Sequence, residues 1–291
     1  MNRKAFAKIN LGLDVLRKRE DGYHIVDMIL QEIDLWDMVE LIPNASGNIT
    51  LSAQAGPSFP LDGSNLVYKA AKIMQDTFSL EAGMHIHVEK HIPMEAGLAG
   101  GSADAAAVLH LVNKAFGLQA DLKQLQKLGL FLGADIPFCL AGGTMRGQGI
   151  GENLTPLRPL KEGLLLLVAK PREGLSTGRV YTALDQEERL CHPDMEALAR
   201  AVSDWENTPQ GLQRLTAATG NVMERTAIRM LPKIGELQRL MLAQGALCAR
   251  MSGSGPTVFG IFPSEEARER CFALLEQKKE LADFLCKSRT R

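Results

Sequence analysis

The sequence predicts an α+β fold. Residues 5–15 alternate between apolar and polar side chains, and this period of two marks a β-strand. The alanine-rich stretch that ends at Phe116 has helical character instead. Strands and helices then follow one another without the strict alternation of a doubly wound sheet, which favours α+β over α/β. The 291 residues are enough for two domains or one large one.

The N-terminal part begins with the strand at residues 5–15. Its apolar positions share one face and Lys8, Asn10 and Asp14 the other, so a half-buried strand is expected. The elements expected next are a turn at Asp21–Gly22, strand segments through Ile42, a helix at Asn65–Phe78 with Ser64 as candidate cap, a strand at Met84–Glu89, a helix stopped by Gly117, and a helix from a cap at Asp121 to Leu132.

A Gly- and Pro-rich zone at residues 142–159 favours a domain boundary there. We therefore expect an N-terminal domain over residues 1–158 and a C-terminal domain over residues 159–291. The elements expected in the second are a strand at Leu164–Ala169, helices within Thr177–Leu184, Asp194–Val202 and Asn221–Gln244, strands at Leu247–Met251 and Thr257–Phe262, and a helix at Glu265–Lys278. The mixed-charge end of the chain, after residue 265, is expected to be a solvated helix face with a frayed terminus.

Composition excludes several classes of protein. The 33 basic residues nearly balance the 34 acidic ones, which argues against a nucleic-acid-binding protein. No apolar run approaches the roughly 20 residues of a membrane span, and the N-terminus lacks a signal-peptide core. The five cysteines form no CxxC pair, so neither a zinc ribbon nor a redox dithiol is indicated. A cytoplasmic protein with reduced thiols is expected.

The strongest local signal is a glycine-rich segment between a predicted strand and a predicted helix. It consists of Pro93, Met94, Glu95, Ala96, Gly97, Leu98, Ala99, Gly100, Gly101, Ser102 and Ala103. Glycines there let backbone N–H groups approach an anion, and the helix N-terminus adds its unpaired donors. The spacing is neither a Walker A loop nor a dinucleotide fingerprint. A tight turn before a helix is the simpler alternative.

Three further features accompany this loop in the chain. Asp135 lies in the string GADIPF, where it could equally cap a helix. Lys8 and Asn10 share a strand face that could be merely solvated. The glycine-rich turn at residues 252–256 could be an ordinary hairpin. Each simple reading is reasonable alone, but the joint occurrence of all four features in this order favours a functional site.

Together these segments resemble the GHMP kinases, the superfamily of galactose, homoserine, mevalonate and phosphomevalonate kinases. The resemblance covers nearly the whole chain and rests on residues 7–13, 93–103 and 251–259. Two further strings, DGYH at residues 21–24 and GADIPF at residues 133–138, are similar to the branch that phosphorylates a cytidine diphosphate-linked methylerythritol.

The resemblance implies a GHMP kinase fold, with an N-terminal domain like domain 2 of ribosomal protein S5 and a ferredoxin-like C-terminal domain. It also implies ATP-dependent phosphorylation of the 2-hydroxyl of 4-diphosphocytidyl-2-C-methyl-D-erythritol in the non-mevalonate isoprenoid pathway. Mg²⁺ would accompany ATP, and no protein side chain is assigned to the metal. The expected partner is a small molecule with a cytidine diphosphate group, bound by a monomer or weak homodimer without contact to nucleic acid or membrane.

By the same resemblance, Asp135 would be the general base and Lys8 would orient and polarise the reacting groups. Residues 93–103 would hold the ATP phosphates, with Asn65 and Lys90 also contacting the nucleotide. Phosphoryl transfer is mostly positioning and charge stabilisation, so a carboxylate, a lysine and a cradle of amides can suffice.

The other substrate is expected at four residues, two of which, Tyr23 and His24, follow from the resemblance. Tyr23 would stack on the cytosine, His24 would read its polar edge, and Asn10 would contact the substrate. Tyr181 is expected as a second aromatic wall, although a core tyrosine is an equal alternative.

One departure from the family pattern is Ala103, which stands where the family loop commonly has a second serine, so Ser102 would serve alone. The cluster His85, His87 and His91 is interpreted as an exposed strand face rather than a metal site. Two other functions stay open: a GHMP kinase for homoserine or a mevalonate derivative, and a nucleotide- or RNA-binding module without catalysis.

Overall fold

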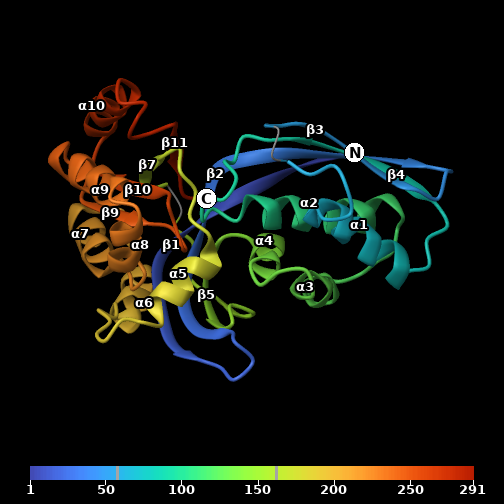
Figure 1. The fold of residues 1–291 in the computed structure, drawn as a ribbon, viewed down its shortest axis with the longest axis horizontal. Helices are drawn as coiled ribbons and strands as arrows, with labels where there is room; N and C mark the ends of the chain where they lie inside the picture. Colours follow the sequence, from blue (N-terminus) through green and yellow to red (C-terminus); the bar gives the residue numbers. More distant parts are fainter. Residues whose placement is uncertain (57–58, 161–162) are drawn as a thin grey trace. The chain divides into compact units, whose positions relative to one another are not determined.

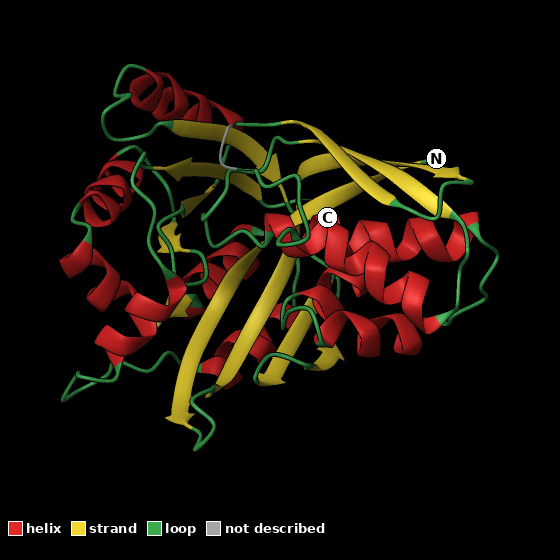
Figure 2. Cartoon of the chain, turned by 45° about the vertical axis from the view of Figure 1, so that its right-hand side comes forward, coloured by secondary structure: helices red, strands yellow, loops and turns green. Residues whose placement is uncertain are grey.

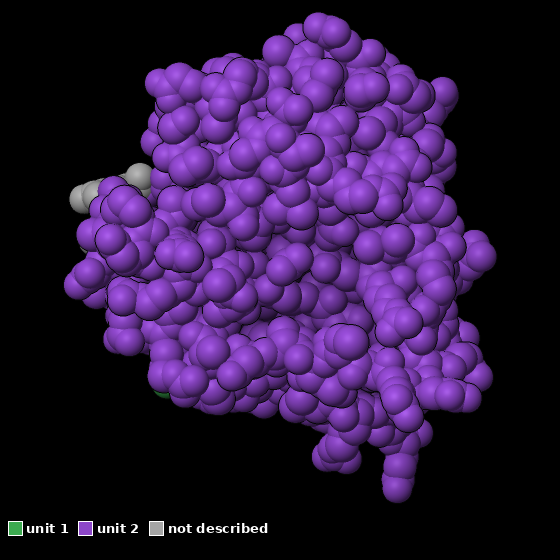
Figure 3. Space-filling view, turned by 90° about the vertical axis from the view of Figure 1, so that its left-hand side faces the viewer, with its two compact units in different colours: residues 1–7, 35–94, 99–142 green, residues 8–34, 95–98, 143–291 purple. Residues whose placement is uncertain are grey.

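The computed structural model describes residues 1–56, 59–160 and 163–291. By the contacts among its residues the chain divides into two compact units that interleave along the sequence, and Figure 3 shows a face formed almost entirely by unit 2. Unit 1 comprises residues 1–7, 35–94 and 99–142, and unit 2 comprises residues 8–34, 95–98 and 143–291. Both mix strands and helices, so the α+β class is confirmed. The expected domain boundary after residue 158 stays a prediction.

Unit 1 is a sheet with helices on one face (Figure 1). Its strands are the start of β1 (Asn2–Lys18), the end of β2 (His24–Asn44), β3 (Ile49–Gln54) and β4 (Gly83–Glu89). β4 pairs antiparallel with β2 and parallel with β3. The helices are α1 (Leu66–Thr77), α2 (Gly100–Ala115), α3 (Leu122–Leu130) and α4 (Ile136–Ala141), of which α1 and α2 lie side by side (Figures 1 and 2).

The core of unit 1 forms where α2 meets the sheet. The alanines of α2 are small enough to let helix and sheet approach closely, and Ala103, Ala105, Ala106 and Ala107 are all buried in this core. They join apolar side chains of β2 and β4, such as Val39 and Ile86. This packing fixes the start of α2, and with it the end of the glycine-rich segment.

Local sequence explains where two helices of unit 1 begin. Asp121 accepts a hydrogen bond from Gln124 N at 2.8 Å, and the Gln124 side chain accepts one from Asp121 N at 2.9 Å. This capping box confirms Asp121 as the cap of α3. Ser64 as cap of α1 is wrong. Asn65 Oδ1 takes that place, 2.9 Å from Val67 N, because the Ser64 hydroxyl donates to Asp62 instead.

Unit 2 contains a four-stranded antiparallel sheet of β7 (Leu165–Lys170), β9 (Cys248–Met251), β10 (Val258–Phe262) and β11 (Phe284–Arg289). In space the strands run β11-β7-β10-β9. One group of helices precedes β9 and one helix precedes β11, which is the strand–helix arrangement of a ferredoxin-like domain. The expected C-terminal fold is thereby confirmed.

Other elements complete unit 2. The remainder of β1 pairs with β8 (Gly220–Asn221), and the start of β2 pairs with β5 (Thr144–Gly149), which pairs with β6 (Asn153–Pro156). The helices are α5 (Thr177–Leu184), α6 (Met195–Ser203), α7 (Pro209–Ala218), α8 (Glu224–Met230), α9 (Lys233–Ala243) and α10 (Glu265–Glu276). The expected strands and helices from residue 164 to residue 278 are confirmed to within a few residues, whereas α7 was not expected.

Two expectations about exposure are wrong. The chain end is not frayed, because Phe284–Arg289 forms β11 and pairs with the edge of β7. The middle of β1 is not half-buried either. Lys8 and Asn10 are 4% and 1% exposed, so the interpretation of their side as a solvated face fails. Buried polar groups require partners, and those of Lys8 are described next.

Candidate functional site

The glycine-rich segment reaches α2 through an unusual backbone. Glu95, Gly97 and Ala99 have left-handed φ angles of 49°, 71° and 57°. Two of these are not glycine, and such residues adopt this conformation at a cost of about 1 kcal/mol. Ala99 is the N-cap of α2 but supplies no side-chain bond, and the first turn carries no acidic residue. The N–H groups at the start of α2 are therefore suited to an anionic ligand.

In unit 2 the carbonyl of Gly97 is the meeting point of three segments that the sequence analysis singled out. It accepts hydrogen bonds from Lys8 Nζ at 3.2 Å and from Ser252 Oγ at 2.9 Å. A Cβ on Gly97 would lie 2.2 Å from Ser252 O, so this position requires glycine. The first strand, the glycine-rich segment and the turn at residues 252–256 thus converge at this carbonyl.

The ammonium group of Lys8 is held firmly. Besides Gly97, it donates to Asn10 Oδ1 at 2.8 Å, and the Lys8 backbone N–H donates to Leu98 O at 3.1 Å. Asn10 therefore acts on Lys8 in this structure, and its predicted contact with substrate stays a prediction. A buried cation placed beside the loop is suited to stabilise negative charge on a phosphoryl group.

Two residues that support the turn at 252–256 were not found from the sequence. Asn221 Nδ2 donates to Met251 O at 2.9 Å and to Gly253 O at 2.8 Å. Glu224 Oε1 accepts from Met251 N at 2.6 Å, and burial raises the pKa of this carboxyl. Both residues are about 30 positions before their partners, and neither belongs to a motif that would have drawn attention to it.

Asp135 occupies the N-cap position of α4 in unit 1. Its side chain makes no capping hydrogen bond, and its φ and ψ of −80° and −16° are helical rather than extended. The interpretation of Asp135 as a simple helix cap therefore loses its main support. Its role as general base stays a prediction.

Lys90 and Asn65, the two predicted nucleotide contacts outside the loop, have partners within unit 1. Lys90 Nζ donates to Asp104 Oδ2 at 2.7 Å and to Asp37, and both carboxylates are fully buried. Burial raises the pKa of Asp104 to about 8, against the opposing charge of Lys90. The amide of Asn65 caps α1 and donates to Pro60 O at 2.6 Å. Their contacts with the nucleotide stay predictions.

Helix α2 positions the loop serine, Ser102, and the alanine that follows it. Ser102 lies in the first turn of this helix and is half-buried, whereas Ala103 is packed into the core of unit 1. An apolar residue therefore suits position 103 here.

The residues predicted for the cytosine form a second cluster in unit 2. The rings of His24 and Tyr181 are stacked, with centroids 4.5 Å apart and planes at 26°. His24 Nε2 lies 2.7 Å from Asp185 Oδ1, and Lys18 Nζ lies 2.6 Å from the other oxygen of this carboxylate. The hydrogen bond from Lys18 lowers the pKa of Asp185. Tyr23 is 59% exposed, so its ring is available to a ligand.

The histidines of the cluster have hydrogen-bond partners other than one another. Ser52 Oγ lies 2.9 Å from His85 Nε2 and 2.8 Å from His87 Nδ1, so the two rings share a hydroxyl group. In the described part of the chain no group of three or more His, Cys, Asp or Glu side chains is arranged to hold a metal ion. Among the same residues, no helix is long and apolar enough to span a membrane.

Comparison with known families defines the class of protein. The model of the GHMP kinases N terminal domain matches residues 65–143, and that of the GHMP kinases C terminal matches residues 190–280. Together they cover more than half of the chain, which is therefore a GHMP kinase. A homoserine kinase from Cytophaga hutchinsonii has the same fold, with a TM-score of 0.75 at 18% identity over 100% of this chain and 93% of its own.

More similar relatives indicate which family within the GHMP kinases the chain resembles most. The chain is 40% identical over 278 residues to a 4-diphosphocytidyl-2-C-methyl-D-erythritol kinase of Clostridium tetani, and 42% identical over 280 residues to one of Clostridium botulinum (strain Eklund 17B / Type B), with 96% of every chain covered. A crystal structure of 4-(cytidine 5'-diphospho)-2C-methyl-D-erythritol kinase superposes with a TM-score of 0.80 at 31% identity, covering 100% of this chain and 99% of the other. The chain belongs to the 4-diphosphocytidyl-2-C-methyl-D-erythritol kinase family.

Proposed function

We infer that the protein transfers a phosphoryl group from ATP to the 2-hydroxyl of 4-diphosphocytidyl-2-C-methyl-D-erythritol, a step of the non-mevalonate isoprenoid pathway. The observation that carries this inference is identity of 40% or more with kinases of this name across almost the entire chain. The convergence of Lys8, Gly97 and Ser252 at the glycine-rich segment supports it independently.

The glycine-rich segment is proposed to hold the ATP phosphates. The uncapped start of α2 offers backbone N–H donors, and the helix dipole favours negative charge at that end. Mg²⁺ is proposed to accompany the nucleotide and to neutralise phosphate charge, since this ion commonly binds phosphate oxygens and water.

Lys8 is proposed to stabilise charge that develops during transfer. Its bonds to Asn10 and Gly97 fix the ammonium group before substrate arrives, so little reorganisation is needed in the transition state. Asp135 is proposed to accept the proton of the attacking hydroxyl. A general base contributes typically ~10²–10⁴-fold in rate, provided that it lies within hydrogen-bond reach of that hydroxyl.

The cytidine end is proposed to bind at the cluster of His24 and Tyr181. The hydrogen bond with Asp185 fixes the orientation of the His24 ring, so this residue can present a constant hydrogen-bonding edge. The exposed ring of Tyr23 is proposed to stack on the base. Binding energy at this remote end can be used to position the reacting hydroxyl.

An ATP-consumption assay tests the function directly. The purified protein is given the cytidine diphosphate-linked substrate, mevalonate or homoserine, each with ATP and Mg²⁺. We expect turnover with the first alone. Equal or greater turnover with mevalonate or homoserine would assign the protein to another branch of the GHMP kinases. We also propose a cytoplasmic monomer or weak homodimer, which sedimentation of the protein and fractionation of cells would test.

A further inference from the structure

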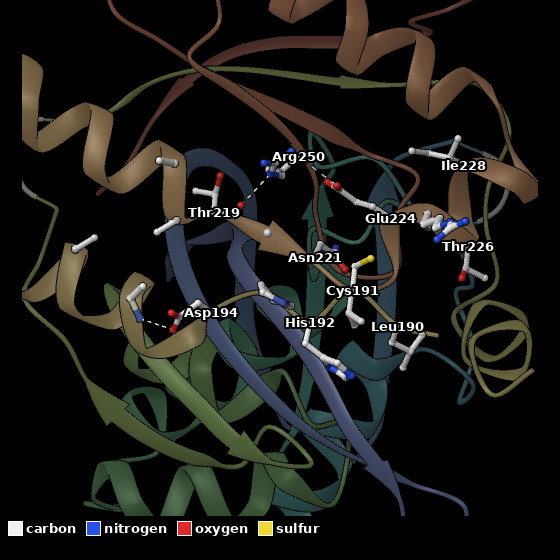
Figure 4. Close-up of a pocket in the computed structure, with 18 of the residues that line it drawn as sticks. Leu190, Cys191, His192, Asp194, Thr219, Asn221, Glu224, Thr226, Ile228 and Arg250 are labelled. Atoms are coloured by element: carbon white, nitrogen blue, oxygen red, sulfur yellow. Dashed lines mark hydrogen bonds and ion pairs between the residues drawn. The ribbon is translucent and has the colours of Figure 1, made fainter. Parts of the chain in front are cut away.

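Unit 2 contains a cavity of about 1120 Å³ that none of the predicted site residues lines. It lies among α6, α7, α8 and the segment at residues 187–194, as the close-up in Figure 4 shows. Its apolar wall includes Leu190, Pro193, Val222 and Ile228. Sites for small molecules are typically concave, mostly apolar and of roughly 300–1,000 Å³, so this cavity is large enough for one.

The charged residues of the cavity are unevenly paired. Six arginines line it: Arg189, Arg200, Arg214, Arg225, Arg229 and Arg250. Arg229 pairs with Glu187, and Arg250 lies 4.0 Å from Glu224. The guanidinium groups of the other four have no hydrogen-bond or ion-pair partner among the described residues, and these arginines come from three helices and the 187–194 segment.

The acidic residues of the cavity do not balance these arginines. Glu187 and Glu224 are engaged as described, and Asp194 caps α6 by accepting from Ala197 N at 2.8 Å. Asp194 and Asp204 have no cationic partner among the described residues, so four unpaired arginines outnumber two unpaired carboxylates in the lining. Excess positive charge over an apolar concave wall is suited to a ligand with an anionic head and an apolar body.

We propose that this cavity binds a small organic anion that joins a phosphate-like head to a short apolar body. Guanidinium groups are the side chains best suited to phosphate, because their planar donors bind two oxygens at once. Solvated arginines alone would explain the charge, but they would not require the apolar wall beside them. The ligand class follows from the two features together.

The floor of the cavity connects it to the predicted phosphate site. Asn221 and Glu224 line the cavity (Figure 4), and they also hold Met251 and Gly253 through the hydrogen bonds described above. The turn that begins there donates from Ser252 Oγ to Gly97 O. A ligand that shifts Asn221 or Glu224 would therefore change the position of this turn, and so modulate the kinase from a separate site.

Calorimetry with hexyl phosphate as the probe tests the proposal. The full-length protein is first saturated with a non-hydrolysable ATP analogue, which blocks the nucleotide site. We expect one hexyl phosphate to bind at least about tenfold more tightly than inorganic phosphate or hexanol, since each of these lacks one half of the ligand. The double variant Arg214→Ser/Arg225→Ser should weaken binding at least about tenfold.

Two further variants complete the design. Arg270→Ser removes an equally exposed arginine of α10 outside the cavity and should leave binding unchanged. Ala201→Phe fills part of the cavity and should weaken hexyl phosphate without removing a charge. Thermal unfolding of each variant separates loss of binding from loss of fold.

Each alternative result is informative. Absence of binding at millimolar hexyl phosphate, or equal affinity in the double variant, would overturn the site. Inorganic phosphate as tight as hexyl phosphate would mean that only an ion binds, and hexanol as tight would mean that the cavity is merely apolar. Both would overturn the ligand class. A KM for ATP that does not respond to bound hexyl phosphate would overturn the coupling to the turn.

Discussion

Replacing Lys90 with methionine separates its structural role from its predicted role in nucleotide binding. The lysine pairs with two buried carboxylates, Asp37 and Asp104. Asp37 has further donors, because His91 N and Ile92 N bond to its other oxygen at 2.5 and 2.8 Å. In contrast, Asp104 Oδ1 is buried without a hydrogen-bond partner among the residues that the structure describes. Asp104 therefore depends on Lys90 more than Asp37 does.

The expected loss of stability in Lys90→Met follows from the burial of the charged groups. Removing one partner of a buried ion pair costs about 3–5 kcal/mol, because the other charge stays in a medium of low polarity. At neutral pH a pKa of about 8 leaves Asp104 largely protonated, so Asp37 would remain as the buried carboxylate without its cation, and Lys90→Met should fall in this range. The whole stability of a domain is typically ~5–15 kcal/mol, which makes the loss a large fraction. Asp104→Asn leaves one cation facing one anion, and we expect a much smaller loss.

The pH dependence provides a second measure. The pKa of Asp104, about 8 in the folded protein, lies above the 3.8 of an ordinary aspartate, so the folded state binds more protons between these values. Stability should therefore fall as pH rises from about 4 to about 8, by at most ~1.4 kcal/mol per pH unit. The Asp104→Asn variant should lose this fall.

Urea denaturation followed by tryptophan fluorescence measures both effects. The chain has two tryptophans, Trp36 in unit 1 and Trp205 in unit 2, so a Trp205→Phe background reports on unit 1 alone. Trp36 is beside the cluster, in edge-to-face contact with His91 at 5.4 Å. If Lys90→Met changed the unfolding free energy by less than about 1 kcal/mol while weakening ATP binding, the buried-pair argument would be wrong.

Three other substitutions test the proposed site. Asp135→Asn should lower turnover by ~10²-fold or more with ATP affinity within a few-fold, and steady-state kinetics with near-normal turnover would exclude it as the base. Gly97→Ala should weaken ATP binding at least about tenfold, because its methyl group would overlap Ser252 O and its φ of 71° disfavours a side chain. Calorimetry showing unchanged binding would contradict this. His24→Ala and Tyr23→Ala should each reduce kcat/KM for the cytidine substrate by ~10- to 100-fold, and weaker ATP binding instead would place them at the wrong end of the site.

Local chemistry made part of the fold predictable from the sequence. The capping box of Asp121 and Gln124 lies within four consecutive residues, and the alternating pattern of β1 can be recognised within about ten. Ser64 and Asn65 are both good caps, and the choice depended on Asp62, which holds the Ser64 hydroxyl. β11 was missed because Phe284–Arg289 has no clear period, and it forms a strand where β7 offers an edge.

The part of the candidate site that could be predicted from the sequence is the glycine-rich segment at residues 93–103, because its glycines and their spacing form a local motif. The meeting of Lys8 with Gly97 was anticipated only as part of a family pattern, since the two residues are 89 positions apart. The partners of Lys90 could not be read from the sequence, because one carboxylate is 53 positions away and the other 14. Such pairings depend on how helices and strands pack, which a local pattern does not contain.

The interleaving of the two units has a consequence for synthesis on the ribosome. Unit 1 is complete once residue 142 has emerged, whereas the first segment of unit 2, residues 8–34, must wait for partners beyond residue 143. Its strands β1 and β2 can pair with each other early, but the outer edges of this pair are covered only by β5 and β8, and open strand edges favour aggregation of nascent chains. Slow translation after residue 142 would lengthen that exposure, so folding yield in the cell should depend on the speed at which the second half is made.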